Sequence, residues 1–156
     1  MSREILFKAK RIDNGEWVEG DLVRSYLKIG NPCITDFAKG IVYGVDKDTI
    51  CQYTGLTDKN GNKIWENDIV KKHFYTDYDA CANSEEYTGV AKFMDCAWVI
   101  DSFRGKYKCV RPIFEAMAYS KDVEYFEVIG NIFDNPELLK GSEESEPTEN
   151  KEADTK

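Results

Sequence analysis

Hydrophobic and polar residues alternate with a period of two along short stretches of this chain. Near the start, Ile5, Phe7 and Ala9 are apolar, whereas Lys8 and Lys10 fall on the opposite side. Alternate side chains of a β-strand face opposite sides of a sheet, so this pattern predicts a strand with one buried face. Other β-prone stretches, cut by glycine or acidic residues, predict further strands at 16–23, 33–37, 40–45, 49–53, 63–65, 69–75, 87–94, 96–100, 107–110 and 125–133.

Two Asn-Gly pairs are expected to turn consecutive strands into hairpins. Asn14-Gly15 follows the first strand, and the positive φ angles that this pair tolerates predict a type I′ turn. Asn60-Gly61, within the segment Lys59–Asn62, predicts a second hairpin between Gln52–Leu56 and Lys63–Trp65. Asn67 then suits a left-handed corner before the next strand. The stretch 52–70 is therefore predicted to be a hairpin that feeds a third strand.

The two hairpins share an order of residues, namely Asn-Gly, tryptophan, an acidic turn, and aspartate followed by two aliphatic residues, at 14–23 and 60–70. Internal duplication and independent use of the same turn chemistry both remain open. The strand lengths suit a meander or a barrel. One or two helical turns could form at 113–119, and Asn135-Pro136 predicts the start of a short closing helix.

Length and hydrophobicity are consistent with a folded, soluble protein. The chain has 156 residues, of which 42% are hydrophobic, and no apolar run approaches the ~18 residues of a membrane span. Charged residues interrupt the first stretch, which lacks a signal or transit pattern, so we expect a cytoplasmic location. We expect an N-terminal β subdomain at 1–66, a C-terminal β subdomain at 67–140, and a tail at 141–156.

The predicted tail is acidic, and it carries half of the net charge of −8. Residues 141–156 contain six acidic residues, two lysines and no aliphatic residue larger than Ala153. This composition is too polar to repay the entropy of ordering, so disorder is expected. The remaining chain is still mildly acidic, which argues against binding to a nucleic-acid backbone.

The cysteines do not form a recognisable metal or disulfide pattern. Five of them occur without a C-x-x-C pair, and no two are closer than thirteen positions: Cys33, Cys51, Cys81, Cys96 and Cys109. Since four well-placed ligands are needed for structural zinc, and since the chain has one histidine, we expect no metal site. Most of these residues are interpreted as reduced thiols that serve as small core hydrophobes.

Candidate catalytic groups are few, and each has a structural alternative. His73, the one histidine, follows Lys71-Lys72 on a predicted strand and has no marked partner nearby in sequence. General-base catalysis needs a positioned partner, and a cysteine nucleophile has the same weakness. The acidic segment at Asp77, Asp79 and Glu85-Glu86 lacks the glycine and the spacing of an EF-hand. No phosphate-binding glycine motif occurs, and no cofactor is expected.

Aromatic residues could line a groove that stacks on bases or holds a peptide. The alternative is ordinary packing in the core or at the end of a barrel. A basic rim would favour single-stranded nucleic acid, but here acidic residues outnumber basic ones, and protein partners fit the charge better. The residues in question are Tyr43, Tyr53, Trp65, Tyr75, Tyr87, Trp98, Tyr107 and Tyr125.

Several motifs together resemble the YopX family of phage and prophage proteins. They comprise Phe7-Lys8-Ala9-Lys10, Asn14-Gly15-Glu16-Trp17, Gln52-Tyr53-Thr54-Gly55-Leu56, Asp58-Lys59-Asn60-Gly61, Asn67-Asp68-Ile69-Val70, Glu127-Val128-Ile129-Gly130-Asn131-Ile132 and Asn135-Pro136-Glu137-Leu138-Leu139. The resemblance covers residues 3–139 in order. It implies a mainly β protein with SH3-like barrel character and long loops, encoded by a phage or prophage and oligomeric. It brings no known activity, and no catalytic residue is carried over.

The sequence thus leads to three hypotheses of function. The first is a non-enzymatic phage or prophage accessory protein that binds and inhibits or modulates a host or defence protein. The second is an oligomeric sponge for a small molecule or nucleotide. The third is a hydrolase-type enzyme that uses His73 or a cysteine. A host or phage protein and further copies of the chain are the expected partners, whereas nucleic acid and membrane are not. The binding residues cannot be chosen from sequence.

Overall fold

The chain is mainly β, and its strands form two antiparallel sheets in the computed structural model, which describes residues 4–23, 30–73, 86–104, 107–113 and 125–142. The first sheet has the order β4-β3-β2-β1-β5-β6, and the second has the order β10-β9-β8-β7-β11. The described residues also form two short 3-10 helices. The strands and helices are β1 Phe7–Lys10, β2 Trp17–Val23, β3 Cys33–Asp36, β4 Ile41–Gly44, η1 Lys47–Thr49, β5 Cys51–Thr57, β6 Lys63–Trp65, β7 Asp68–His73, β8 Glu86–Met94, β9 Ala97–Arg104, β10 Tyr107–Pro112, β11 Tyr125–Asn131 and η2 Pro136–Ser142.

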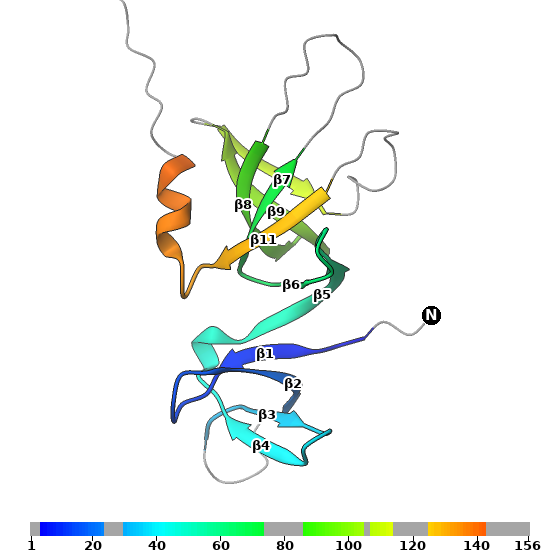
Figure 1. Ribbon diagram of the computed structural model, residues 1–156, viewed down its shortest axis with the longest axis vertical. Helices are drawn as coiled ribbons and strands as arrows, with labels where there is room; N and C mark the ends of the chain where they lie inside the picture. Colours follow the sequence, from blue (N-terminus) through cyan, green and yellow to red (C-terminus); the bar gives the residue numbers. More distant parts are fainter. Residues whose placement is uncertain (1–3, 24–29, 74–85, 105–106, 114–124, 143–156) are drawn as a thin grey trace, which may run out of the picture.

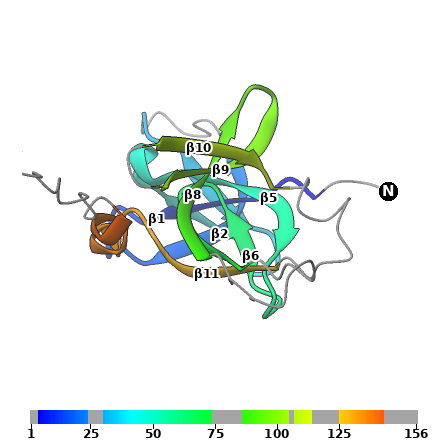
Figure 2. The ribbon, with the colours of Figure 1, turned by 90° about the horizontal axis from the view of Figure 1, so that it is seen from above.

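The chain passes from one sheet to the other between Trp65 and Asp68. Figure 1 shows strands β1–β4 in the lower half, strands β7–β11 in the upper half, and the β5–β6 hairpin between them. The view from above shows η2 at the periphery of the sheets (Figure 2). The sheet boundary coincides with the predicted subdomain boundary, but the division at 66 into two folding units stays a prediction.

The first hairpin forms as predicted, but its turn is not type I′. Gly15 has a φ of 73°, whereas Asn14 is not among the residues with positive φ, and a type I′ turn needs both. Arg11 N donates to Glu16 O at 2.9 Å, and Gly15 N donates to Arg11 O at 3.0 Å. The loop between the strands is therefore longer than two residues, and glycine alone supplies the left-handed conformation.

The second hairpin and the corner after it are confirmed. Strands β5 and β6 flank the loop, in which Asp58 N donates to Asn62 O at 2.8 Å and Gly61 has a φ of 83°. The pairing of β5 with β6 is irregular, because the register shifts between Tyr53 and Thr57. Asn67 has a φ of 66°, the left-handed corner that the sequence predicts, and β7 starts directly after it.

In the described part of the chain, buried apolar residues form three clusters rather than one core. Ala9, Ile34 and Val45 lie inside the first sheet. Cys51, Tyr53 and Trp65 lie at the junction of the sheets, with Trp17 and Phe133 packed against them. The largest cluster belongs mainly to the second sheet, but it includes Ile64 of β6: Ile64, Val70, Ala91, Trp98, Ile100, Ile113 and Phe126. The β5–β6 hairpin belongs to the first sheet but contributes Ile64 to the core of the second.

The SH3-like barrel implied by the family resemblance is not confirmed, because both sheets are open in the described strands. The first sheet comes closest to closure. An isolated bridge joins Arg11 to Val45, and Asp46 N donates to Lys10 O at 2.9 Å. This contact joins the end of β1 to the end of β4 only at one point, whereas a closed barrel needs a continuous ladder.

The closing helix is present, but it is a 3-10 helix at Pro136–Ser142. The predicted helical turns at 113–119 lie outside the described residues except for Ile113, and so does the predicted tail except for its first two residues. In the described part of the chain, no helix has the length and apolar character needed to cross a membrane.

Candidate functional site

A cleft of about 470 Å³ lies where the two sheets meet. Strands β1, β2, β6, β7 and β11 and the loop before β6 contribute to it, so residues far apart in sequence come together there. Its lining is mostly polar: Lys8, Glu19, Asn62, Lys63, Trp65, Asp68, Val128, Gly130 and Asn131. By position, this cleft is the first candidate for a binding site.

A buried ion pair crosses the junction of the sheets in this cleft. Lys8 Nζ of β1 donates to Asp68 Oδ1 of β7 at 2.7 Å, and the two side chains are 13% and 2% exposed. Trp65 N donates to the other carboxylate oxygen, Asp68 Oδ2, at 2.8 Å. Burial raises the pKa of Asp68, and the nearby ammonium group of Lys8 opposes this effect. Both carboxylate oxygens are engaged within the protein, so this pair fastens the sheets together.

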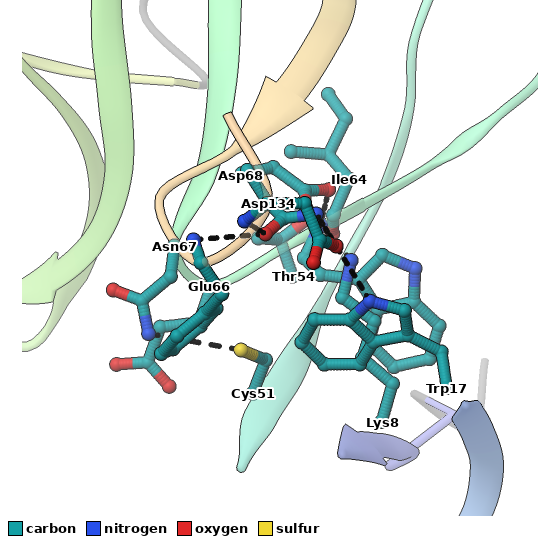
Figure 3. Close-up of polar contacts among 12 residues, drawn as sticks. Lys8, Trp17, Cys51, Thr54, Ile64, Glu66, Asn67, Asp68 and Asp134 are labelled. Atoms are coloured by element: carbon teal, nitrogen blue, oxygen red, sulfur yellow. Dashed lines mark hydrogen bonds and ion pairs between the residues drawn. The ribbon is translucent and has the colours of Figure 1, made fainter. Parts of the chain in front are cut away.

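A second polar group fastens the segment after β11 to the first sheet (Figure 3). Trp17 Nε1 donates to Asp134 Oδ2 at 2.8 Å, and Asn131 Nδ2 donates to the same oxygen at 2.9 Å. Lys10 Nζ donates to Asp134 Oδ1. These hydrogen bonds, the one from Lys10 foremost, lower the pKa of Asp134 to about 2. Asp134 is therefore ionised at neutral pH, and it holds the segment after β11 against the first sheet.

The charges of the cleft are balanced. Lys63 Nζ lies 3.0 Å from Glu19 Oε2, so each of the two lysines that line the cleft has a carboxylate partner in it. Both ammonium groups also lie 5.5 Å from the ring centroid of Trp65, in cation–π contact. A nucleotide phosphate would meet no excess positive charge here. The cleft does not favour the nucleotide-sponge hypothesis, which stays a prediction.

The three described thiols differ in burial. Cys51 is buried, and burial raises its pKa to about 11, so the thiol is not a ready nucleophile. Its Sγ lies 3.7 Å from Asn67 Nδ2. Cys33 is buried and Cys96 is exposed, and all three are free of disulfides. The prediction of core thiols therefore fits two of these three residues.

The remaining candidates for catalysis and metal binding are only partly described. His73 is the last residue of β7, where it pairs with Glu86 and Tyr125, but its side chain lies outside the described residues. The same is true of Cys81, of the side chain of Cys109, and of the acidic segment 77–86 apart from the backbone of Glu86. Within the part that the structure describes, no group of three or more His, Cys, Asp or Glu could hold a metal ion. The enzyme hypothesis stays untested.

The aromatic residues do not line a common groove in the described part of the chain. Tyr53 and Trp65 pack against each other at the junction, with 5.4 Å between ring centroids. Trp98 packs against Phe93 at 5.1 Å in the second sheet, and Tyr43 lies under the guanidinium of Arg11 at 4.7 Å in the first. Tyr75 and the side chains of Tyr87, Tyr107 and Tyr125 lie outside the described residues. The described aromatic residues mostly serve packing, which is the alternative to a groove that binds bases or a peptide.

An exposed apolar surface, missed from the sequence, lies at the edge of the first sheet. We call Ile12, Phe37, Ile41 and Val42 the edge patch; they are 56%, 74%, 42% and 57% exposed. β4 is the terminal strand of its sheet, and a groove of about 400 Å³ runs between β4 and the turn after β1. In the sequence, the apolar pair Ile41-Val42 could have indicated this exposed surface. Consecutive residues of a strand face opposite sides of the sheet, and only one side of this sheet can be buried.

Comparison with known protein families gives a match over most of the chain. A family model described as YopX protein matches residues 6–140. No curated protein matches the chain.

Proposed function

The chain belongs to the YopX family, and from this premise we propose that it is a non-enzymatic phage or prophage accessory protein. In this proposal it acts by binding a host or defence protein, which it inhibits or modulates. Catalysis contributes nothing to this function.

The edge patch is the observation that carries the proposal. Its four apolar side chains lie on or next to the terminal strand of the first sheet, where they remain in contact with water. Long apolar edges are a liability that proteins usually cover, shorten or charge. Exposed apolar side chains gathered at one edge of a sheet are instead typical of a surface that binds another protein.

The charge of the protein supports a protein partner rather than nucleic acid. The net charge is −8, and nucleic-acid binding depends on neutralising phosphates with lysine and arginine. The polar cleft between the sheets is an alternative surface, but its charged side chains are already engaged with one another. Binding there would require breaking internal pairs, whereas binding at the edge patch buries side chains that now face water.

The proposal is tested with two matched substitutions in the full chain. Ile41→Lys places a charge on the edge patch, and Ile129→Lys places the same charge on β11 of the other sheet. The two isoleucines are 42% and 36% exposed, so both variants should fold. The tagged wild-type protein and both variants are used to capture partners from host lysate, with circular dichroism to confirm folding.

We expect one host protein, identified by mass spectrometry, to be recovered with the wild type and with Ile129→Lys but not with Ile41→Lys. The purified partner should bind Ile41→Lys at least about tenfold more weakly, a loss of about 1.4 kcal/mol. Equal recovery by both variants, or equal loss from both, would overturn the proposal, because binding would then not depend on the edge patch.

A further inference from the structure

Two terminal strands, β11 of the second sheet and β4 of the first, differ in how their edges are covered. The outer edge of β11 is met by the loop of the second hairpin, because Lys59 N donates to Phe126 O at 2.9 Å and Val128 N donates to Asp58 Oδ2 at 3.1 Å. Among the described residues, no segment covers the whole outer edge of β4. Its last residue alone is met, where Ile12 N donates to Gly44 O at 3.1 Å.

The ladder of β3 and β4 determines which backbone groups of β4 face outward. Val45 N donates to Pro32 O at 3.0 Å, which places Val45 among the residues that bond toward β3. Residues of an antiparallel strand alternate between bonding to one neighbour and facing the other side. Tyr43 and Ile41 therefore bond toward β3, whereas Gly44 and Val42 face away, in agreement with the bond from Ile12 to Gly44. The N–H and C=O of Val42 meet no strand in the described part of the chain.

An apolar groove lies directly beside this open position. A Cβ placed on Gly44 would lie 3.8 Å from Ile12 Cδ1, so Ile12 lies over the face of β4 to which Gly44 belongs. Val42 is two residues away and shares that face. A side chain of an added strand would enter between these two exposed aliphatic groups. The groove has a volume of about 400 Å³, which is enough for such side chains.

The charged groups at the turn beside the groove are predominantly acidic. The guanidinium of Arg11 lies on the ring of Tyr43 and is paired with the carboxylates of Asp13 and Glu16. One positive group thus faces two negative ones, and both carboxylates are well exposed. The turn would attract a partner that carries lysine or arginine next to its apolar residues.

From these observations we propose that β4 binds its partner by strand addition: an extended apolar segment of another protein, flanked by lysine or arginine, pairs with the open edge at Val42 and fills the groove beside Ile12. This inference rests on the proposed function and names the binding mode and the class of partner. Main-chain hydrogen bonds to Val42 supply part of the affinity, and the groove and the acidic turn select the sequence.

Three synthetic peptides of defined sequence test whether β4 binds by strand addition. The first is a synthetic peptide with an alternating β-branched core flanked by lysines. The second has the same core flanked by glutamates, and the third is the lysine peptide with alternate backbone nitrogens methylated, which removes its strand donors. Fluorescence anisotropy measures their binding to the full chain. We expect the glutamate and methylated peptides to bind at least about tenfold more weakly than the lysine peptide.

Two variants of Val42 separate backbone pairing from side-chain contact. Val42→Pro removes the outward N–H and suits an edge strand, whereas Val42→Ala keeps the N–H and also shortens the side chain. We expect Val42→Pro to bind the lysine peptide at least about tenfold more weakly than Val42→Ala. Glu16→Gln should reduce the preference for lysine over glutamate flanks. Circular dichroism confirms that each variant is folded.

Equal binding by the two Val42 variants, or undiminished binding of the methylated peptide, would overturn strand addition. If Ile41→Lys releases the captured host protein while both Val42 variants retain it, the proposed function stands and only the binding mode fails. If ultracentrifugation shows a dimer that Val42→Pro dissociates, and the lysine peptide does not bind, the occupant of the edge is a second copy. The inference of a basic foreign segment would then be wrong.

Discussion

The two Asn-Gly hairpins use the same turn residues for different purposes. Both have glycine in the left-handed region, with φ of 73° at Gly15 and 83° at Gly61. The first loop bonds mainly within itself, as in the bond of Arg11 N to Glu16 O. The second loop docks on β11, and it covers the edge of the other sheet. Turn chemistry therefore decides that the chain reverses, and neighbouring residues decide whether the loop is used for internal packing.

The aspartate of each loop is the clearest difference between them. Asp58 is 7% exposed and accepts hydrogen bonds from Asn60 N and Asn62 N, each at 2.8 Å, and from Val128 N at 3.1 Å. The side chain of Asp13 is 64% exposed and accepts from Arg11 Nε at 2.9 Å. One carboxylate organises its loop and joins it to another sheet, whereas the other pairs with a neighbour on the surface beside the edge patch.

Replacing each aspartate by alanine should produce the largest contrast. Asp58→Ala leaves three backbone N–H groups without their acceptor, and we expect the free energy of unfolding to fall by about 3 kcal/mol. Asp13→Ala should leave it nearly unchanged, because an exposed ion pair contributes little. Urea denaturation followed by tryptophan fluorescence measures both. Similar losses for the two variants would show that docking on β11 adds no stability.

Replacing each glycine by alanine gives a smaller effect that separates turn strain from docking. A Cβ at either position would meet nothing within 4 Å, so no steric clash adds to the cost of the left-handed backbone. We expect Gly15→Ala to cost about 1 kcal/mol. Gly61→Ala should cost about 2 kcal/mol, because adjustment of the turn also weakens its bonds to β11. Thermal unfolding of both variants provides the comparison, and a larger loss for Gly15→Ala would contradict it.

Acid should affect the second loop more than the first. Burial raises the pKa of Asp58, but hydrogen bonds from Asn62, Val128 and Asn60 outweigh it, and the net shift is downward. A lowered pKa in the folded state adds stability above the unfolded value of about 3.9, and this stability is lost as pH falls through the folded value. Denaturation between about pH 5 and 2 should show a smaller loss for Asp58→Asn than for the wild type. Asp13→Asn should follow the wild type closely, since solvent screens its exposed pair; an identical slope for Asp58→Asn would refute this account.

Local patterns predict the hairpins well but not what they touch. The second hairpin, the left-handed Asn67 and the strand after it all depend on neighbouring residues, so the sequence reveals them. The docking of Asp58 on Val128 and the pairing of Lys8 with Asp68 join residues that are 70 and 60 positions apart. No local periodicity encodes such pairs.

The edge patch was not predicted from the sequence for a related reason. Ile41 and Val42 are ordinary strand residues in sequence, and their exposure depends on β4 being the terminal strand. The order of strands in a sheet is set by contacts across the whole chain. The type I′ turn at Asn14 was wrong because a loop of more than two residues also accommodates Asn-Gly, and sequence alone does not fix loop length.

The smallest expected effect concerns one ion pair at each hairpin loop, which joins the second loop to β11 but stays within the first hairpin. Lys59 Nζ lies 2.7 Å from Glu127 Oε2, and both side chains are about one-third exposed, whereas Arg11 Nη1 lies 3.5 Å from Glu16 Oε2 on the surface. Double-mutant cycles with alanine isolate each pair from the other contacts of its members. We expect a coupling energy of about 0.5 kcal/mol for Lys59 with Glu127 and close to zero for Arg11 with Glu16, and the first should weaken in about 1 M salt. Equal coupling in both hairpins would mean that the ion pair does not help the second loop to hold β11, and that its docking depends on Asp58 and the backbone bonds alone.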